Sequence, residues 1–304
     1  MKKLSLGAGA IALAMSVGPT HASDLPSSRE ALPPPPPPPY FEPAPIANWS
    51  GFYLGLNAGG VFGGSDTITT TTGALSANVD AAAIAATGSG AGGDNSAGFI
   101  GGGQIGYNWK LAPTIVAGVE VDIQGVAGRD NEMSLTSATP GVLNPSHTFS
   151  GSLSASQSLD YLGTVRARVG YLIKPTLLVY GTGGLAYGGA GLSASSIAGE
   201  SNAAGRLVGG AFNNVGSSGT RVGWTAGGGL EWMFAPRWTA RIEYLYYDLG
   251  TATVGGPMQL YSSGAAGAGL GVTQTGAQFN GHIVRAGLNY LFGGVAPPPI
   301  VAKY

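Results

Sequence analysis

The chain has 304 residues, of which 44% are hydrophobic and only 10% are charged. A soluble domain averages about 25% charged residues, so this chain has too little charge to cover a water-exposed surface. The net charge of -1 argues against a nucleic-acid surface. The lack of cysteine excludes disulfides and thiolate chemistry. No apolar run beyond the extreme N-terminus approaches the roughly 18 residues of a membrane-spanning helix.

The first 22 residues have the pattern of an export signal. Lys2 and Lys3 precede the apolar stretch "LSLGAGAIALAMSVG", and "THA" places small residues before Ser23. This arrangement predicts a signal peptide over residues 1–22 that is cleaved after Ala22. A membrane anchor is the alternative, but the apolar stretch is short for a bilayer.

A proline-rich segment follows over residues 23–48. Its sequence "ALPPPPPPPYFEPAPIAN" predicts an extended polyproline II spacer, because proline fixes φ and removes hydrogen-bond donors. We therefore expect a stiff periplasmic linker. The alternative is a contact of this segment with peptidoglycan or another periplasmic partner.

Eight stretches from Trp49 onward alternate apolar and other residues with the period of a strand. In the first, "WSGFYLGLNAGG", Phe52, Leu54 and Leu56 share one face. The stretches cover residues 49–60, 99–110, 115–125, 160–173, 177–188, 222–234, 238–250 and 282–292. Each is about ten to fourteen residues long, which matches a tilted strand that crosses a bilayer.

The connections between these stretches are of two kinds. Three are tight turns that contain proline and a basic residue, "KLAPT", "KPT" and "APR". Four are long and rich in small residues, near residues 63–96, 126–156, 188–219 and 250–276. This pattern predicts an all-β fold, an eight-stranded antiparallel up-and-down transmembrane β-barrel over residues 49–292, with short periplasmic turns, four long extracellular loops and a tail over residues 293–304.

A soluble eight-stranded barrel such as a lipocalin gives the same alternation with the faces reversed. The positions of the aromatic residues favour the transmembrane form, because an interfacial girdle needs them at the strand ends. The girdle predicted at the short-turn ends consists of Trp109, Tyr171, Trp232, Phe234, Trp238 and Tyr290, with Phe292, and the other rim is marked by Tyr187, Trp224 and Tyr246.

Four acids and four arginines fall on the faces predicted to point into the barrel. The pairs expected at similar heights are Glu120 with Arg168, Asp122 with Arg166, Glu231 with Arg241, and Glu243 with Arg285. A confined lumen penalises an unpaired charge by several kcal/mol, so a ladder of ion pairs is the expected filling. The carboxylates could instead form a glycosidase pair, but each has a basic neighbour, so no catalytic residue is predicted.

Two further motifs are weak signals for a cofactor or metal. "GGGQIG", from Gly101 to Gly106, fits the G-x-G-x-x-G pattern, but a dinucleotide site needs a helix next, which "YNWKLAPT" does not predict. His147 and His282 are isolated, and no Ser–His–Asp arrangement is visible. The sequence therefore predicts no cofactor, no metal site and no enzyme activity.

Several motifs in order carry a family resemblance: "WSGFYLGLNAGG", "YLGTVRARVGY", "LVYGTGGLAYG", "RIEYLYYDLG" and "VRAGLNYLF". Over residues 49 to 292 the chain resembles the alphaproteobacterial outer-membrane "porin family", the outer-membrane immunogenic proteins, which are small barrels related in architecture to OmpA and OmpX. The resemblance implies contact with outer-membrane lipids and insertion by the barrel-assembly machinery, with Phe292 as the aromatic end of the assembly signal. "GGVAPPPIVAKY" follows Phe292, so the signal is either internal or replaced by Tyr304.

The sequence predicts a location in the outer membrane of a Gram-negative bacterium and leaves two functions open. The first is a plugged structural barrel that supports the cell envelope and presents its loops as a surface antigen. The alternative is a small-solute diffusion pore, which would need the predicted ion pairs displaced from the lumen or a higher strand count.

Overall fold

The structure is a computed structural model that describes residues 48–64, 67–74, 85–93, 97–142, 144–260 and 271–293. The predicted signal peptide, almost all of the proline-rich segment and the tail after Gly293 lie outside these residues, and so does Tyr304. All described residues belong to one compact unit. Within them, no helix combines the length and apolar character that crossing a membrane requires.

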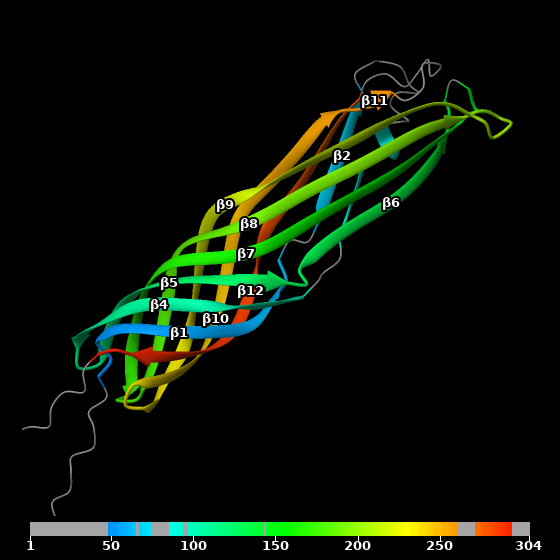
Figure 1. Cartoon of the computed structure of the whole chain (residues 1–304). Coiled ribbons are helices and arrows are strands. Elements are labelled where there is room, and N and C mark those ends of the chain that lie inside the picture. Colours follow the sequence, from blue (N-terminus) through cyan, green and yellow to red (C-terminus); the bar gives the residue numbers. More distant parts are fainter. Residues whose placement is uncertain are drawn as a thin grey trace, which may run out of the picture. The chain divides into compact units, whose positions relative to one another are not determined.

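One antiparallel sheet closes into a ring (Figure 1). Its strands are β1 (Gly51–Phe62), β2 (Ile68–Ala74), β3 (Gly90–Gly92), β4 (Gly98–Ala112), β5 (Ile115–Ala127), β6 (Asp130–Pro140), β7 (Thr148–Lys174), β8 (Leu177–Ser201), β9 (Leu207–Ala235), β10 (Trp238–Pro257), β11 (Gln259–Leu260) and β12 (Gly271–Leu291). The pairings run β1-β4-β5-β7-β8-β9-β10-β12, and β12 pairs with β1. The predicted all-β, antiparallel, up-and-down closed sheet is confirmed.

The strands of the ring are strongly tilted. A row of paired residues that starts at Leu177 on β8 passes once around the ring and returns to β8 at Tyr187, ten residues further along. Such a stagger is what tilts the strands of a closed barrel. Closure also pairs both edges of every strand in the ring, so no edge is left there to recruit another chain.

The two faces of the strands alternate as the sequence predicts. In β1, Phe52, Leu54 and Leu56 are exposed on the outer face, whereas Tyr53 and Asn57 are buried inside. The outward positions expected in the other strands are likewise exposed, including Ile105, Val121, Ile123, Val165, Val169, Leu185, Val222, Ile242, Val284 and Leu288.

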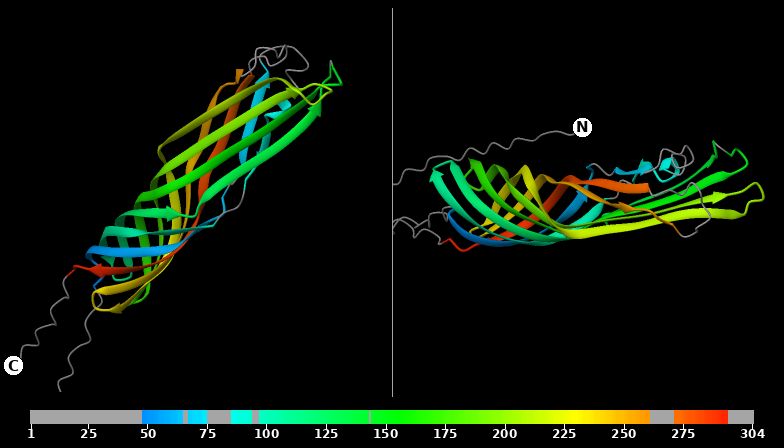
Figure 2. Two further views of the ribbon diagram at one scale, coloured as in Figure 1. Left: turned by 45° about the vertical axis from the view of Figure 1, so that its right-hand side comes forward. Right: turned by 90° about the horizontal axis from the view of Figure 1, so that it is seen from above.

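The strands are longer than predicted, and this corrects the expected loops. β7, β8 and β9 have 27, 25 and 29 residues, and much of the predicted loops 126–156, 188–219 and 250–276 is strand. Four strands that the sequence analysis did not anticipate also lie in predicted loops: β2 and β3 in 63–96, β6 in 126–156 and β11 in 250–276. Figure 2 shows β7, β8 and β9 running on beyond β1, β4 and β5. We call this part the extension: β2, β3, β6, β11 and residues 148–159, 190–201, 207–219, 251–257 and 271–279.

One-residue bulges in β7 and β10 mark where the ring passes into the extension. On either side of the bulge in β7, Val165 and Leu153 both stand at odd positions, yet Val165 is exposed and Leu153 is buried. The register with β8 shifts between Leu159 and Tyr161, and a bulge exchanges the faces that odd and even positions take. β10 does the same near Gly250, where Ile242 is exposed before the shift and Val254 is buried after it. Much of the interior of the extension is therefore apolar, with hydrogen-bonded threonines buried where β2 meets β12, and its surface is mostly polar.

The bulges lie close to breaks in other strands, and we call residues 63–64, 128–129, 160 and 248–250 the collar. Gly63, Gly128 and Gly250 have φ values of 63°, 75° and 76°, which favour glycine. Arg129 ties the collar together, since its guanidinium donates to the Tyr247 hydroxyl and to the carbonyls of Gly63 and Asn280, each at 2.8 Å. The collar separates the ring from the extension.

Candidate functional site: the charged interior of the ring

The eight charged residues predicted to point inward all lie buried inside the ring. Each is at most 3% exposed, because its neighbours in sequence take the apolar outer face. They come from five strands: Glu120 and Asp122 on β5, Arg166 and Arg168 on β7, Glu231 on β9, Arg241 and Glu243 on β10, and Arg285 on β12.

Glu120 is the most connected carboxylate. Arg166 donates to its Oε1, and Arg241 donates to both oxygens, with 3.1 Å between Nη2 and Oε1. The Tyr53 hydroxyl donates to Oε2 at 2.6 Å. Charge-assisted hydrogen bonds of this kind are about twice as strong as neutral ones, so Glu120 joins β1, β5, β7 and β10 across the lumen.

A second group contains two acids and two arginines, and it shares Arg166 with Glu120. Arg166 donates to Asp122 Oδ2 at 2.8 Å and to Glu243 Oε1 at 3.0 Å. Arg285 donates to the same Asp122 oxygen at 3.0 Å and to Glu243 Oε2 at 2.8 Å. Each arginine thus serves both carboxylates, and the charges balance within the set.

The third group surrounds Arg168, nearer the short turns. Its Nη1 donates to Glu231 Oε2 and its Nε to Asn108 Oδ1, both at 2.9 Å. The guanidinium also lies 4.8 Å from the ring centre of Tyr53 and 5.3 Å from that of Tyr180, which is within cation–π range.

The predicted partners are only partly those that the structure brings together. Glu243 and Arg285 are paired in register and in contact, as expected. Glu120 lies opposite Arg166 and not opposite Arg168. Tyr171 of β7 faces Ile115 at the start of β5, but β7 continues to Lys174, so heights counted from the strand ends do not give the register. Glu231 lies opposite Arg241 in register, as expected, but its ion pair is with Arg168 across the lumen.

Two apolar layers enclose the charged network. On the side of the short turns, the turn-side layer contains Trp49, Tyr53, Val116, Leu172, Leu178, Tyr180, Met233 and Leu291. On the other side lies a second apolar layer, which begins inside the ring with residues such as Leu162, Leu245 and Ile283 and continues into the extension. The network therefore has an apolar layer on each side along the barrel axis.

Trp49 is the residue of this site that the sequence analysis missed. It precedes β1, is fully buried, and its indole N–H donates to the Pro175 carbonyl in the β7–β8 turn at 2.9 Å. Gly51, two residues later, has a φ of 125°, which lets the chain turn inward before the strand begins. A large aromatic residue just before a first strand was the available signal.

The predicted aromatic residues lie on the outer face near the short turns. Trp109, Tyr171, Trp232, Phe234 and Trp238 are exposed. Trp238 and Tyr290 form an edge-to-face pair with ring centres 5.2 Å apart. At the other rim, Trp224 packs 5.3 Å from Tyr246. Phe292 directly follows β12, is exposed, and its amide donates to the Phe52 carbonyl at 2.8 Å.

The weaker motifs fall at places that fit no cofactor chemistry. Gly101 to Gly106 lie inside β4, which continues as a strand to Ala112. His147 lies between β6 and β7, with its Nδ1 2.7 Å from Glu200 Oε1, and His282 Nδ1 is 2.6 Å from the Tyr244 hydroxyl on the outer face. In the part of the chain that the structure describes, no cluster of three or more His, Cys, Asp or Glu suits a metal ion.

Comparisons with known proteins agree with this architecture. The family model described as "Outer membrane protein beta-barrel domain" matches residues 41–292. The chain is 32% identical to the 31 kDa outer-membrane immunogenic protein of Brucella melitensis over 257 residues, which cover 82% of this chain and 86% of the relative. It is 34% identical over 149 residues to the 22 kDa outer membrane protein of Rhizobium leguminosarum, covering 48% and 52% of the two chains.

Among solved structures, the outer membrane protein OprG of Pseudomonas aeruginosa aligns with 81% of this chain and 97% of its own, at 11% identity and a TM-score of 0.41. The sequence relatives are named as outer-membrane proteins, which agrees with the predicted location in the outer membrane of a Gram-negative bacterium.

Proposed function

Because the chain belongs to the outer membrane protein β-barrel family, we propose that it is a sealed structural barrel that supports the outer membrane and displays the extension outside the cell. The observation that carries the proposal is the buried charge network between two apolar layers. As in its Brucella relative, named as immunogenic, the displayed part would be the surface that a host meets.

The outer face of the ring supports a membrane-spanning role for its eight strands. Leu56, Val169 and Ile242 are more than 60% exposed although they are apolar, which suits contact with lipid. All backbone groups in a bilayer must be paired internally, and a closed ring achieves this. The exchange of faces at the collar supports a membrane boundary there, with the short turns in the periplasm.

The filled lumen supports a seal over the alternative of a diffusion pore. Arg166 and Arg285 are at most 2% exposed and span the interior. One observation favours some water in the lumen: Arg168 Nη2, Arg241 Nε and Arg285 Nη1 are buried without a hydrogen-bond partner among the described residues. Isolated waters could satisfy these donors, whereas steady conduction needs a continuous path past both apolar layers.

Conductance tests the seal directly. We expect the full-length protein in planar bilayers to show no steady conductance, because the charged network and both apolar layers block the axis. The gel mobility of the same preparation, unboiled and boiled, serves as the control that the barrel is folded, since a closed barrel resists detergent until heated. A steady current from the folded protein would establish the pore alternative instead.

Protease treatment tests the orientation. The turn from Asn202 to Arg206 lies at the tip of the extension, and Arg206 is exposed. We expect trypsin added to intact cells to cut after Arg206, because exposed tips are preferred sites, and to leave Lys174 and Arg237 in the short turns uncut. The R206Q variant is the matched control and should lose this fragment. Cleavage at Arg206 only after the outer membrane is opened would reverse the orientation.

A further inference from the structure

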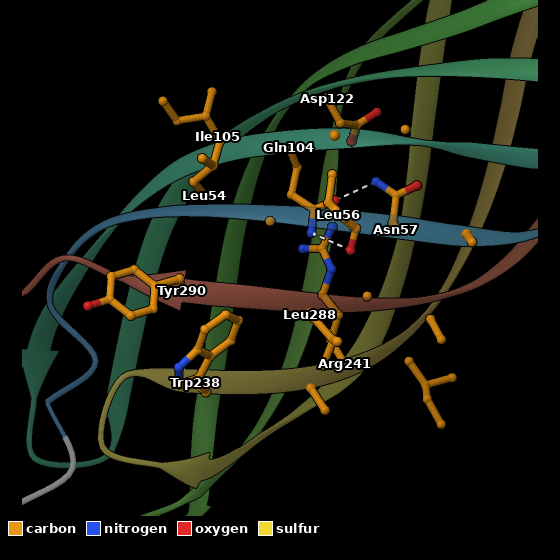
Figure 3. A pocket seen from close by; sticks show the side chains of 18 of the residues that line it. Leu54, Leu56, Asn57, Gln104, Ile105, Asp122, Trp238, Arg241, Leu288 and Tyr290 are labelled. Atoms are coloured by element: carbon orange, nitrogen blue, oxygen red, sulfur yellow. Dashed lines mark hydrogen bonds between the residues drawn. The ribbon is translucent and has the colours of Figure 1, made fainter.

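β6 has a neighbouring strand on only one of its two edges. In the ring every strand is paired on both edges, as Figure 3 shows for β1, which runs between β4 and β12 with Leu56 beside Leu288. Among the described residues, β6 pairs with β7 alone, and it forms the border of the extension in Figure 1. We call the edge of β6 that faces away from β7, over residues 132–140, the open edge.

The segment that precedes β4 covers the inner face of β6 and not the open edge. Leu135 lies over Gly90 of β3, where an added Cβ atom would clash with its side chain. The Ser137 hydroxyl, on the same face, donates to the Thr87 carbonyl at 3.0 Å. Both contacts are made by side chains of β6, and no backbone hydrogen bond within the described residues joins the open edge to residues 85–93.

The pairing with β7 shows which backbone groups face the open edge. The N–H of Gly141 donates to the His147 carbonyl at 2.8 Å, and the register stays unbroken from this pair to Asp130. Because hydrogen-bonded pairs alternate in an antiparallel ladder, odd-numbered residues of β6 bond to β7. Pro140 fits this assignment, since its missing N–H is not needed by β7. The residues whose backbone groups face the open edge are Glu132, Ser134, Thr136, Ala138 and Pro140.

The open edge lacks the features that usually protect an edge strand. Natural edges carry lysine, inward-pointing charges, proline or bulges, or are very short. Between Glu132 and Pro140 the sequence "MSLTSAT" contains no charge and no proline, and Ser134, Thr136 and Ala138 are exposed. An edge of this kind accepts an added strand through backbone hydrogen bonds.

A second copy of β6 fits the open edge in one direction. An antiparallel pairing centred on Thr136 places the edge-facing groups of both copies opposite each other, Thr136 to Thr136 and Ser134 to Ala138, and forms about six backbone hydrogen bonds. Glu132 then meets Pro140, so no two acids are opposed. A parallel pairing in register would bring the two Glu132 carboxylates together, and like charges in neighbouring strands are destabilising.

The direction of β6 decides which copies can form this pair. β6 runs from the collar towards the tip of the extension. Two copies in one membrane point the same way, so their β6 strands would be parallel, whereas an antiparallel pair needs copies in two facing membranes. We propose that the open edge joins two copies of this protein on neighbouring cells. The inference rests on the proposed orientation, which puts the extension outside the cell.

The proposed pair sets a limit on the distance between the two membranes. The chain from Arg129 in the collar to Thr136 at the centre of the pair spans about 23 Å at roughly 3.3 Å per residue. Two copies that meet at Thr136 therefore hold their collars at most about 46 Å apart.

Clustering of vesicles tests the pairing. The full-length protein is placed in two sets of phosphatidylcholine vesicles with different fluorescent lipids, and clusters that contain both colours are counted. Trypsin cleavage after Arg206 measures the fraction of copies whose extension faces outward, and the gel mobility of unboiled samples shows that they are folded. We expect mixed clusters when both sets hold the protein and none when one set is empty, with facing membranes at most about 46 Å apart in electron micrographs.

Charges at Thr136 test the register, because this residue meets its own copy at the centre of the pair. T136K and T136E should each abolish clustering with itself, since like charges are then opposed, and T136K vesicles should cluster with T136E vesicles. S154K adds the same charge at an exposed position of β7, away from the open edge. It is the matched control and should cluster as the unmodified protein does.

Four results would overturn the pairing: no clusters from folded, outward-facing protein, clustering of T136K with itself, no clusters from T136K mixed with T136E, or clusters with empty vesicles. A steady current through protein that still clusters would refute the seal and leave the pairing in place. Cleavage at Arg206 in cells only after the outer membrane is opened would refute the contact between cells together with the proposed orientation.

Discussion

Replacing Arg166 and Arg168 together with alanine is expected to lower sharply the temperature at which the barrel unfolds in detergent. The change removes the ion-pair partner of Glu231 and leaves Asp122 and Glu120 with one arginine each at hydrogen-bond distance, Arg285 and Arg241. Removing one side of a buried ion pair costs about 3–5 kcal/mol. The measurement is the temperature at which the unboiled gel band converts to the boiled one, and R206A at the exposed tip is the control.

The same double variant should also widen the middle of the lumen. With two guanidinium groups gone, water gains space beside an acidic wall, but both apolar layers remain, so planar bilayers should still show no steady current. Adding E120Q and E231Q should recover part of the lost stability, because the two remaining acids, Asp122 and Glu243, are then balanced by Arg241 and Arg285. An unchanged unfolding temperature would show that the arginines are not structural.

Replacing Trp49 with alanine is expected to have the next largest effect. A buried tryptophan truncated to alanine costs about 3–5 kcal/mol, and Trp49 is fully buried in the turn-side layer. The variant should therefore unfold at a lower temperature on the same gel.

Two further variants test what the buried indole of Trp49 contributes to the unfolding temperature. W49F keeps an aromatic ring in the layer but loses the hydrogen bond to the Pro175 carbonyl, worth about 1 kcal/mol, and part of the indole packing. W238A removes an exposed tryptophan on the outer wall and should leave the unfolding temperature closer to that of the unmodified protein. If W49A and W238A were equally stable, Trp49 would not form part of the seal.

The ring and its inward charges could be predicted from the sequence because both depend on a period of two. Alternation alone placed Leu54 outside and Glu120 inside. The register could not be predicted in the same way, since it depends on where each strand ends, and β7 extends three residues beyond Tyr171 before the turn. Because of this offset between the strand ends, the residue opposite Glu120 is Arg166 and not the expected Arg168.

The extension was missed for a different physical reason. Ser, Gly and Ala are common in loops, and β propensity alone gives little weight to a stretch such as "SGSLSASQSL". A bulge at Asp160 moves its apolar positions to the inner face, and only the tertiary structure shows that they meet an apolar interior. Trp49 was missed because it was counted with the strand that it precedes.

The sheet structure of the extension determines what an antibody can recognise. Ser134, Ser154, Ser195 and Asn214 form one exposed row, with each residue paired in register to the next across β6, β7, β8 and β9. Within one strand, every second side chain is turned into the apolar interior, as Leu153 and Ala155 are. An epitope on this surface is therefore discontinuous, because its side chains come from several strands. A linear peptide copied from β7 lacks the side chains of the neighbouring strands, so a vaccine antigen would have to keep the strands paired.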